Sequence, residues 1–163
     1  MALVIDGKTV EDRFCAVSAD APVPDSGGLL VDLELWQLQR EALLASGRPL
    51  GLRLRSDEHP ETIIADLEHF ALIALEFPVF RDGRAYSYAR LLRRSGFTGE
   101  LRAVGDVLLD QLHYMQRVGF DAFEIDAADP QAAFEQAQSE FSVWYQPAGD
   151  ERPWASRMRG TSG

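Results

Sequence analysis

The stretch LLVDLELWQLQREALLASG, residues 29–47, joins a short, mostly apolar run to a longer segment with helical periodicity. The first part, residues 29–33, has the character of a strand buried in a sheet. In the longer part, apolar residues recur on one side of a helix: Leu35, Leu38, Ala42 and Ala45. Gly47 follows at the position of a left-handed cap. Because a strand followed by a helix is the repeating unit of parallel α/β proteins, this stretch predicts an α/β fold.

The same strand–helix pattern recurs along the rest of the chain. The further strands are expected in LGLRLR, LIALEF, ELRAVG and DAFEI, at residues 50–55, 72–77, 100–105 and 121–125. The helices that follow them are expected at residues 60–71, 86–97, 106–120 and 130–141. About five strand–helix units therefore predict a mostly parallel sheet in a single α/β domain over residues 1–146. Periodicity leaves open whether the sheet is doubly wound or barrel-like, and the chain length favours the open, doubly wound sheet.

The two ends of the chain differ from this repeating part. LVIDGKTVEDRF, residues 3–14, places an Asp-Gly turn between two short apolar segments, which is typical of a β-hairpin. SADAPVPDSGG, residues 18–28, reads as a connector because it is rich in Pro and Gly. Residues 147–163 lose all periodicity, and we expect this tail to be disordered.

The composition limits the partners that the chain can bind. The 163 residues include 26 Asp and Glu against 16 Lys and Arg, which gives a formal net charge of -10. Binding to nucleic acid or to an anionic membrane surface is not expected, because both attract basic proteins. The sole cysteine, Cys15, cannot form an internal disulfide. The opening residues MALVIDGKTVEDRF contain neither a signal peptide nor a membrane span, so we expect a cytoplasmic protein.

The segment FRDGRAYSYARLL, residues 80–92, leaves the carboxyl end of the third expected strand, where α/β proteins bind ligands. Asp82 and Gly83 suit a tight turn. A helix is expected to begin at Tyr86 or Ser87, and the free N–H groups of its first turn favour an anion. Three guanidinium groups are then expected to clamp an oxyanion: Arg81, Arg84 and Arg90. The alternative is that these arginines pair with neighbouring acids.

A second set of candidates surrounds the junction between ELRAVG and the next helix. Asp106 and Asp110 lie one helical turn apart, so their carboxylates are candidates for acid–base catalysis or for binding a hard cation. The alternative is that Asp106 is the helix N-cap and that Asp110 is solvated or pairs with Arg102. Including this junction, the expected ligand-binding residues are Arg81, Asp82, Arg84, Tyr86, Ser87, Arg90, Arg102 and Gln111. No spacing of His or Cys predicts a metal site, and no nucleotide-binding or hydrolase motif is present.

Three segments of the chain resemble a bacterial family known as domain of unknown function 934. They are RDGRAYS at residues 81–87, GELRAVGDVL at residues 99–108 with DQL after it, and GFDAFE at residues 119–124. The resemblance extends from residue 3 to residue 146. Members of this family are commonly labelled oxidoreductases of sulfite reduction, because their genes lie beside sulfite reductase. The resemblance therefore implies a role in sulfur assimilation, with sulfite reductase as a partner.

The residues themselves limit what this role can be. Sulfite reduction transfers six electrons, normally through siroheme and an iron–sulfur cluster, and one cysteine cannot ligate such a cluster. We therefore expect an accessory protein that binds a small sulfur oxyanion or an acidic group of its partner, and not the reductase itself. One alternative is a small oxidoreductase with an undefined cofactor, in which Asp106 or Asp110 moves protons. Another is a purely structural partner of sulfite reductase.

Overall fold

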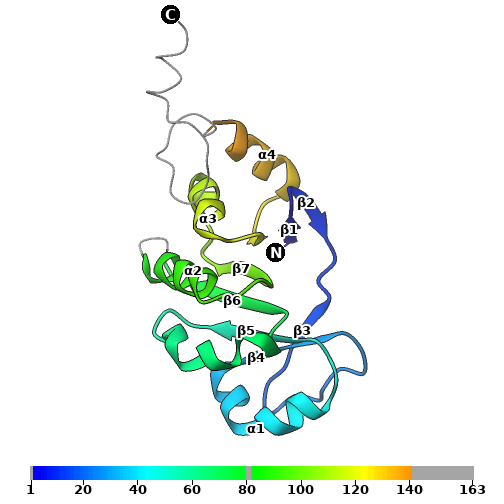
Figure 1. Cartoon of the computed structure of the whole chain (residues 1–163). Coiled ribbons are helices and arrows are strands. Elements are labelled where there is room, and N and C mark those ends of the chain that lie inside the picture. Colours follow the sequence, from blue (N-terminus) through cyan, green and yellow to red (C-terminus); the bar gives the residue numbers. More distant parts are fainter. Residues whose placement is uncertain (1, 80–81, 141–163) are drawn as a thin grey trace, which may run out of the picture.

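The computed structural model describes residues 2–79 and 82–140, which contain one sheet of eight strands (Figure 1). The strands are β1 (Ala2–Ile5), β2 (Lys8–Val10), β3 (Phe14–Ala16), β4 (Gly28–Asp32), β5 (Leu50–Leu54), β6 (Leu72–Phe77), β7 (Glu100–Gly105) and β8 (Ala122–Ile125). β4 to β8 confirm the strands predicted from the sequence. β1 and β2 form the predicted hairpin, whose turn residues Asp6 and Gly7 have φ angles of 53° and 77°. β3 has no counterpart among the predicted strands.

The helices are α1 (Leu33–Ala45), η1 (Pro60–His69), α2 (Arg84–Arg94), η2 (Leu109–Gln111), α3 (Leu112–Val118) and α4 (Pro130–Glu140), where η1 and η2 are 3₁₀ helices. Each of them lies within or beside a predicted helix, so the α/β fold is confirmed. No helix in the described part of the chain is both long enough and apolar enough to cross a bilayer. The tail predicted at residues 147–163 lies outside the described residues.

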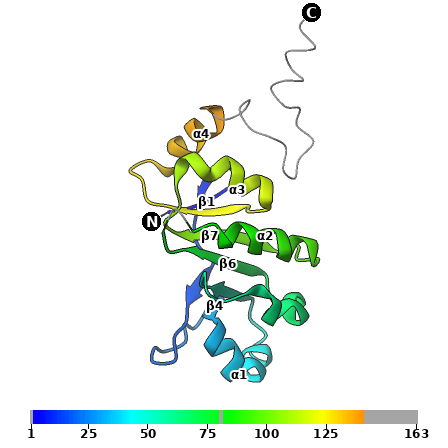
Figure 2. The ribbon, with the colours of Figure 1, turned by 90° about the vertical axis from the view of Figure 1, so that its left-hand side faces the viewer.

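Strands β3 to β8 are parallel, and each pairs with the next one along the chain. The sheet order is β2-β1-β8-β7-β6-β5-β4-β3, with β1 antiparallel to both of its neighbours. The prediction of a doubly wound sheet is wrong, because this order never reverses. Right-handed crossovers that all step in one direction place their helices on one face of the sheet. Figures 1 and 2 show α1, α2 and α3 on the same side of the strands.

The two edge strands, β2 and β3, are joined by residues 11–13 alone. The four Cα steps from β2 to β3 reach at most roughly 14 Å, whereas eight strands laid flat separate the two edges by roughly 34 Å. The sheet must therefore curl until its edges come close, as they do in a barrel. In Figure 1 the link from β2 to β3 runs along the side of the strands opposite α2 and α3. We call this side the helix-free face and residues 11–13 the N-terminal link.

Side chains of each strand alternate between the two faces of the sheet. On the helical face, apolar side chains of the strands and helices form the core, with Leu52, Leu75 and Phe123 against Trp36 and Leu92 as examples. The helix-free face carries the alternate side chains, and several of these are charged: Arg53, Glu76, Glu100, Arg102 and Glu124. The helical face is therefore the apolar core, and the helix-free face is the charged interior of the curl.

Helix α1 buries a different side from the one predicted. Leu35 and Leu43 are buried, whereas Leu38 is 74% exposed. Before the kink at Gln39 the buried residues are Leu35 and Trp36, and Leu38 lies about 200° around the helix from Trp36, so it points to solvent. The predicted cap at Gly47 is confirmed by its φ of 67°. At the other end, where no cap was predicted, the Asp32 side chain accepts a hydrogen bond from the N–H of Leu35 over 2.7 Å.

Arg102 fastens the N-terminal link to the helix-free face. Its side chain is 1% exposed, and Nη1 and Nη2 donate to the two carboxylate oxygens of Asp12 over 2.9 and 3.2 Å. Nε and Nη2 also donate to Glu100, over 3.1 and 2.8 Å. These partners are needed, because a buried guanidinium group without them would be strongly destabilising. The alternative in which Asp110 pairs with Arg102 is therefore wrong.

The conformation at the end of β7 depends on Gly105. Gly105 has a φ of 88°, and a Cβ at this position would lie 2.5 Å from the carbonyl oxygen of Phe77. Gly105→Ala should lower the free energy of unfolding by about 2 kcal/mol or more, because backbone strain and a steric clash add together. Urea denaturation measures this loss.

The matched control for this substitution is Gly96→Ala. Gly96 has a φ of 99°, but no atom lies within 4 Å of an added Cβ. This variant should lose only the conformational part of the free energy, about 1 kcal/mol. Equal losses in the two variants would show that Gly105 does not pack against β6.

Candidate functional site

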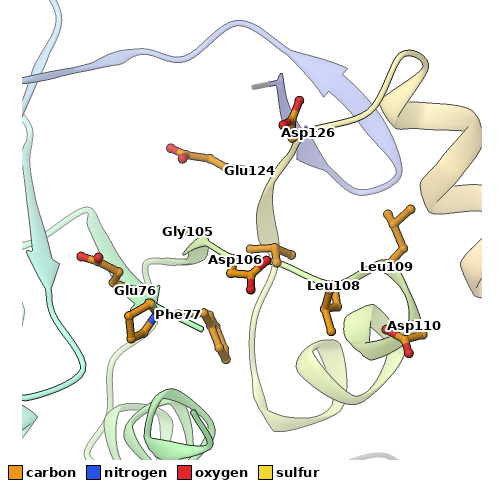
Figure 3. A pocket seen from close by; sticks show the side chains of 11 residues that line it. Glu76, Phe77, Gly105, Asp106, Leu108, Leu109, Asp110, Glu124 and Asp126 are labelled. Carbon is orange, nitrogen blue, oxygen red and sulfur yellow. The ribbon is translucent and has the colours of Figure 1, made fainter. Parts of the chain in front are cut away.

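The carboxyl ends of β6, β7 and β8 surround a cavity of about 860 Å³ (Figure 3). Its polar lining consists of five carboxylates: Glu76, Asp106, Asp110, Glu124 and Asp126. We call it the acidic cavity. Glu76 of β6 and Glu124 of β8 reach it from the helix-free face, and the other three acids follow β7 and β8 in the chain. The acidic cavity therefore lies where the sequence predicted a ligand site, but its charge is negative.

Asp106 and Asp110 both line the acidic cavity, so the structure brings these two candidates together. They do so from different elements after β7, because Asp106 lies in the loop and Asp110 lies in η2. Asp106 is not a helix N-cap, because its N–H donates to the carbonyl oxygen of Phe77 over 2.7 Å and helical structure begins only at Leu109. The predicted helix start is wrong because the backbone of Asp106, after the turn at Gly105, is still hydrogen-bonded to the end of β6.

The charges around the acidic cavity are only partly compensated. Arg53 lies 3.3 Å from Glu76, and Arg102 lies 3.8 Å from Glu124. Asp106, Asp110 and Asp126 have no ion pair within the described residues. In the same part of the chain, no three side chains of Asp, Glu, His or Cys are grouped so that they could hold a metal ion. The cavity thus favours hydroxyl or cationic groups and repels an oxyanion.

Arg84 is the first residue of α2 and is held by an acid. Its Nη2 lies 2.6 Å from Oδ2 of Asp82, its Nε donates to both oxygens of that carboxylate, and Nη2 also donates to Ser56 over 3.0 Å. The hydrogen bonds from Arg84 lower the pKa of Asp82 to about 2. Helix α2 begins at Arg84, earlier than the predicted Tyr86 or Ser87. Arg81 lies outside the described residues.

Tyr86 connects α2 to the loop after β7. Its ring packs against Phe77 and Tyr114, with centroids 5.2 and 5.0 Å away, and its hydroxyl donates to Oε1 of Gln111 over 3.4 Å. Burial raises the pKa of Tyr86 to about 12, so the hydroxyl stays protonated at neutral pH. Ser87 is exposed. Tyr86 and Gln111 are thus brought together, and their contact positions the loop that carries Asp110.

Arg90 belongs to a second cavity, of about 530 Å³, between α2 and α3. Four arginines line it: Arg90, Arg93, Arg94 and Arg117. We call it the arginine cavity. Nη2 of Arg90 donates to the hydroxyl of Tyr114 over 3.2 Å, and the guanidinium carbon lies 6.0 Å from the centre of that ring. Sequence reasoning did not select the other three arginines, although basic residues in the last turns of two helices are a visible pattern.

The four arginines of the arginine cavity differ in burial and in hydrogen-bond partners. Arg93 has a structural role, because it donates to the carbonyl oxygens of Phe97, Gly99 and Gly119 and pairs with Asp121 at 3.3 Å. Arg117 is buried. Arg90 and Arg94 are exposed, and no carboxylate of the described residues lies within 4.0 Å of either guanidinium. Arg90 and Arg94 are therefore the cations that the arginine cavity offers to a ligand.

The pair of Asp82 and Arg84 predicts a pH dependence of stability. The pKa of Asp82 is about 2 in the folded protein and about 4 in the unfolded chain. The ionised carboxylate of Asp82 therefore stabilises the fold fully at pH values above about 4. That stability is lost as the pH falls toward about 2. Asp82→Asn should thus unfold at lower urea concentration than the wild type near neutral pH, with the difference shrinking in acid.

Asp57→Asn is the control for this experiment, because Asp57 is 69% exposed and lies 3.8 Å from Arg55. Its unfolding midpoint should follow that of the wild type at every pH. A midpoint for Asp82→Asn that also follows the wild type would show that Arg84 is not held by Asp82.

Comparison with known proteins places the chain in a family. A comparison with curated proteins gives no match. The sequence model of one family matches residues 51–155, more than half of the chain, and this range includes both cavities. The resemblance noted in the sequence is thereby confirmed: the chain belongs to the family described as "Bacterial protein of unknown function (DUF934)".

Proposed function

We propose that the chain is an accessory protein of assimilatory sulfite reduction, which binds an acidic group in its arginine cavity. The observation that supports this most is the gathering of four arginines around one cavity in a chain of net charge -10. The site proposed here therefore keeps Arg90 from the clamp predicted at residues 80–92, but it lies farther along α2 than Arg84. Arg84 is occupied by Asp82, whereas Arg90 has no carboxylate partner in the described part of the chain.

The chemistry of the arginine cavity suits a carboxylate or a small oxyanion. A guanidinium group donates two parallel hydrogen bonds to either group, and these charge-assisted bonds are stronger than neutral ones. The ends of α2 and α3 both reach the cavity, and their carbonyl groups disfavour an anion. Arg93 offsets this effect by donating to carbonyl oxygens there. An exposed tyrosine beside exposed arginines is also typical of protein interfaces, so an acidic surface of sulfite reductase fits as the partner.

The setting in sulfur assimilation rests on the resemblance of the sequence to labelled members of the family. On this proposal sulfite reductase supplies the six-electron chemistry, and the present chain supplies binding. Its role is to hold the reductase, or a sulfur oxyanion on the way to it, through Arg90 and Arg94.

A second candidate function is catalysis in the acidic cavity. It is favoured by the position of Asp106 and Asp110 at the carboxyl ends of sequentially ordered parallel strands, which is where barrel enzymes place their active sites. One of these carboxylates then transfers protons beside a bound cofactor. An absorbance spectrum and a native mass of the purified protein distinguish the two functions, because a retained cofactor favours the enzyme.

Substitution of Arg94 tests the arginine cavity. Arg94→Ala should weaken binding of sulfite, sulfate or phosphate by about ten-fold, because one charge-assisted hydrogen bond contributes about 1.5 to 3 kcal/mol. Arg94→Lys should restore only part of the affinity, because an ammonium group lacks the planar fork. Calorimetric titration at low ionic strength measures the affinity for the anions. Co-purification with sulfite reductase tests binding to the protein partner.

Arg84→Ala is the control that separates the two possible anion sites. Its affinity for anions should equal that of the wild type, because Arg84 is held by Asp82. If Arg84→Ala loses binding and Arg94→Ala keeps it, the anion site lies at the start of α2, around Arg84, and not in the arginine cavity. If the wild type binds neither these anions nor the reductase, the proposed function is wrong.

A further inference from the structure

A third cavity, of about 730 Å³, lies on the helix-free face, between the N-terminal hairpin and the first residues of β7. The register of the hairpin pairs Leu3 with Val10 and Ile5 with Lys8, so these four side chains share one face of β1 and β2. All four line the cavity, and Phe14 of β3 reaches it from the opposite edge of the sheet. The cavity is therefore formed where the two edges of the curled sheet meet. We call it the seam cavity.

The wall of the seam cavity is apolar and accessible. Leu3 is 7% exposed, but Val10 is 37% exposed, although both belong to the same wall. Cavities of roughly 300 to 1,000 Å³ with an apolar lining and a few polar groups are typical of small-molecule sites. The exposed Val10 thus offers an apolar contact that no side chain of the described residues covers completely.

The floor and the rim of the seam cavity differ in charge. At the floor, Arg102 is compensated by Glu100 and Asp12, so it offers no free charge. The rim carries two charges of each sign: Asp6, Lys8, Glu11 and Arg13. Within residues 2–79 and 82–140, none of these four makes an ion pair within 4.0 Å. The rim therefore presents both signs of charge above an apolar wall.

We propose that the seam cavity binds a small zwitterion with an apolar body, the chemical class of an α-amino acid with an apolar side chain. The apolar body packs against Leu3, Val10 and Phe14. The ammonium group and the carboxylate of the ligand each meet an opposite charge on the rim. A ligand that carries a single charge is instead repelled by the two rim residues of the same sign. This site is independent of the arginine cavity, because it lies on the helix-free face and uses none of the same residues.

Calorimetric titration of the full chain with L-leucine and L-phenylalanine tests this proposal. At least one of them should bind saturably at millimolar concentration or below. Three analogues remove one feature each: L-serine lacks the apolar body, 2-phenylethylamine lacks the carboxylate, and 3-phenylpropionate lacks the ammonium group. Each analogue should bind at least about ten-fold more weakly than the better amino acid.

A pair of matched variants places the ligand in the seam cavity. Val10→Ser should weaken binding of the amino acid by about five-fold, because apolar contact is lost. Val23→Ser is the control, because Val23 is 56% exposed and does not line this cavity. Circular dichroism and the urea midpoint check that both variants fold, which their exposed positions allow.

Three results would overturn the proposal. The first is that neither amino acid binds at millimolar concentration. The second is that the single-feature analogues bind as tightly as the amino acids, which would exclude recognition of a zwitterion. The third is that Val10→Ser binds as the wild type does, which would place the ligand elsewhere. None of these results bears on the arginine cavity, whose anion binding is measured separately.

Discussion

The ion cluster that Asp12 and Glu100 form with the buried guanidinium group of Arg102 holds the sheet in its curled shape. The N-terminal link joins opposite edges of the sheet and is too short for a flat arrangement, so the strands must curl. Arg102 holds that link from inside the curl, with both Nη atoms on one carboxylate. The curl in turn brings the carboxyl ends of β6 to β8 around the acidic cavity and closes the seam cavity below it.

Much of the fold could be predicted from the sequence, because strands and helices follow from local periodicity. β4 to β8 and the hairpin were found in this way. The order of the strands could not be predicted, because it depends on contacts such as Arg102 with Asp12, which lie 90 positions apart. The buried side of α1 also escaped prediction, because the apolar residues are spread around the helix and the side that contains Trp36 is buried in place of the side that contains Leu38.

The candidate site was predicted in position better than in charge. Asp106, Asp110 and Arg84 lie at the carboxyl ends of the strands, as expected, but the alternative of arginines paired with acids describes Arg84 correctly. A count of charges could not show that Glu76 and Glu124, each inside a strand, also reach that place. The arginine cavity arises because α2 and α3 are neighbours, which is a property of the sheet order and not of either helix.

NMR of the Arg102 guanidinium group tests whether this residue holds the N-terminal link inside a curled sheet. The structure predicts slowly exchanging guanidinium protons for Arg102, with nuclear Overhauser effects to the side chain of Asp12. Asp12→Asn should speed the exchange of these protons, because the bidentate carboxylate is lost. A rapidly exchanging and freely rotating guanidinium group in the wild type, without such effects to Asp12, would show that Arg102 does not hold the N-terminal link.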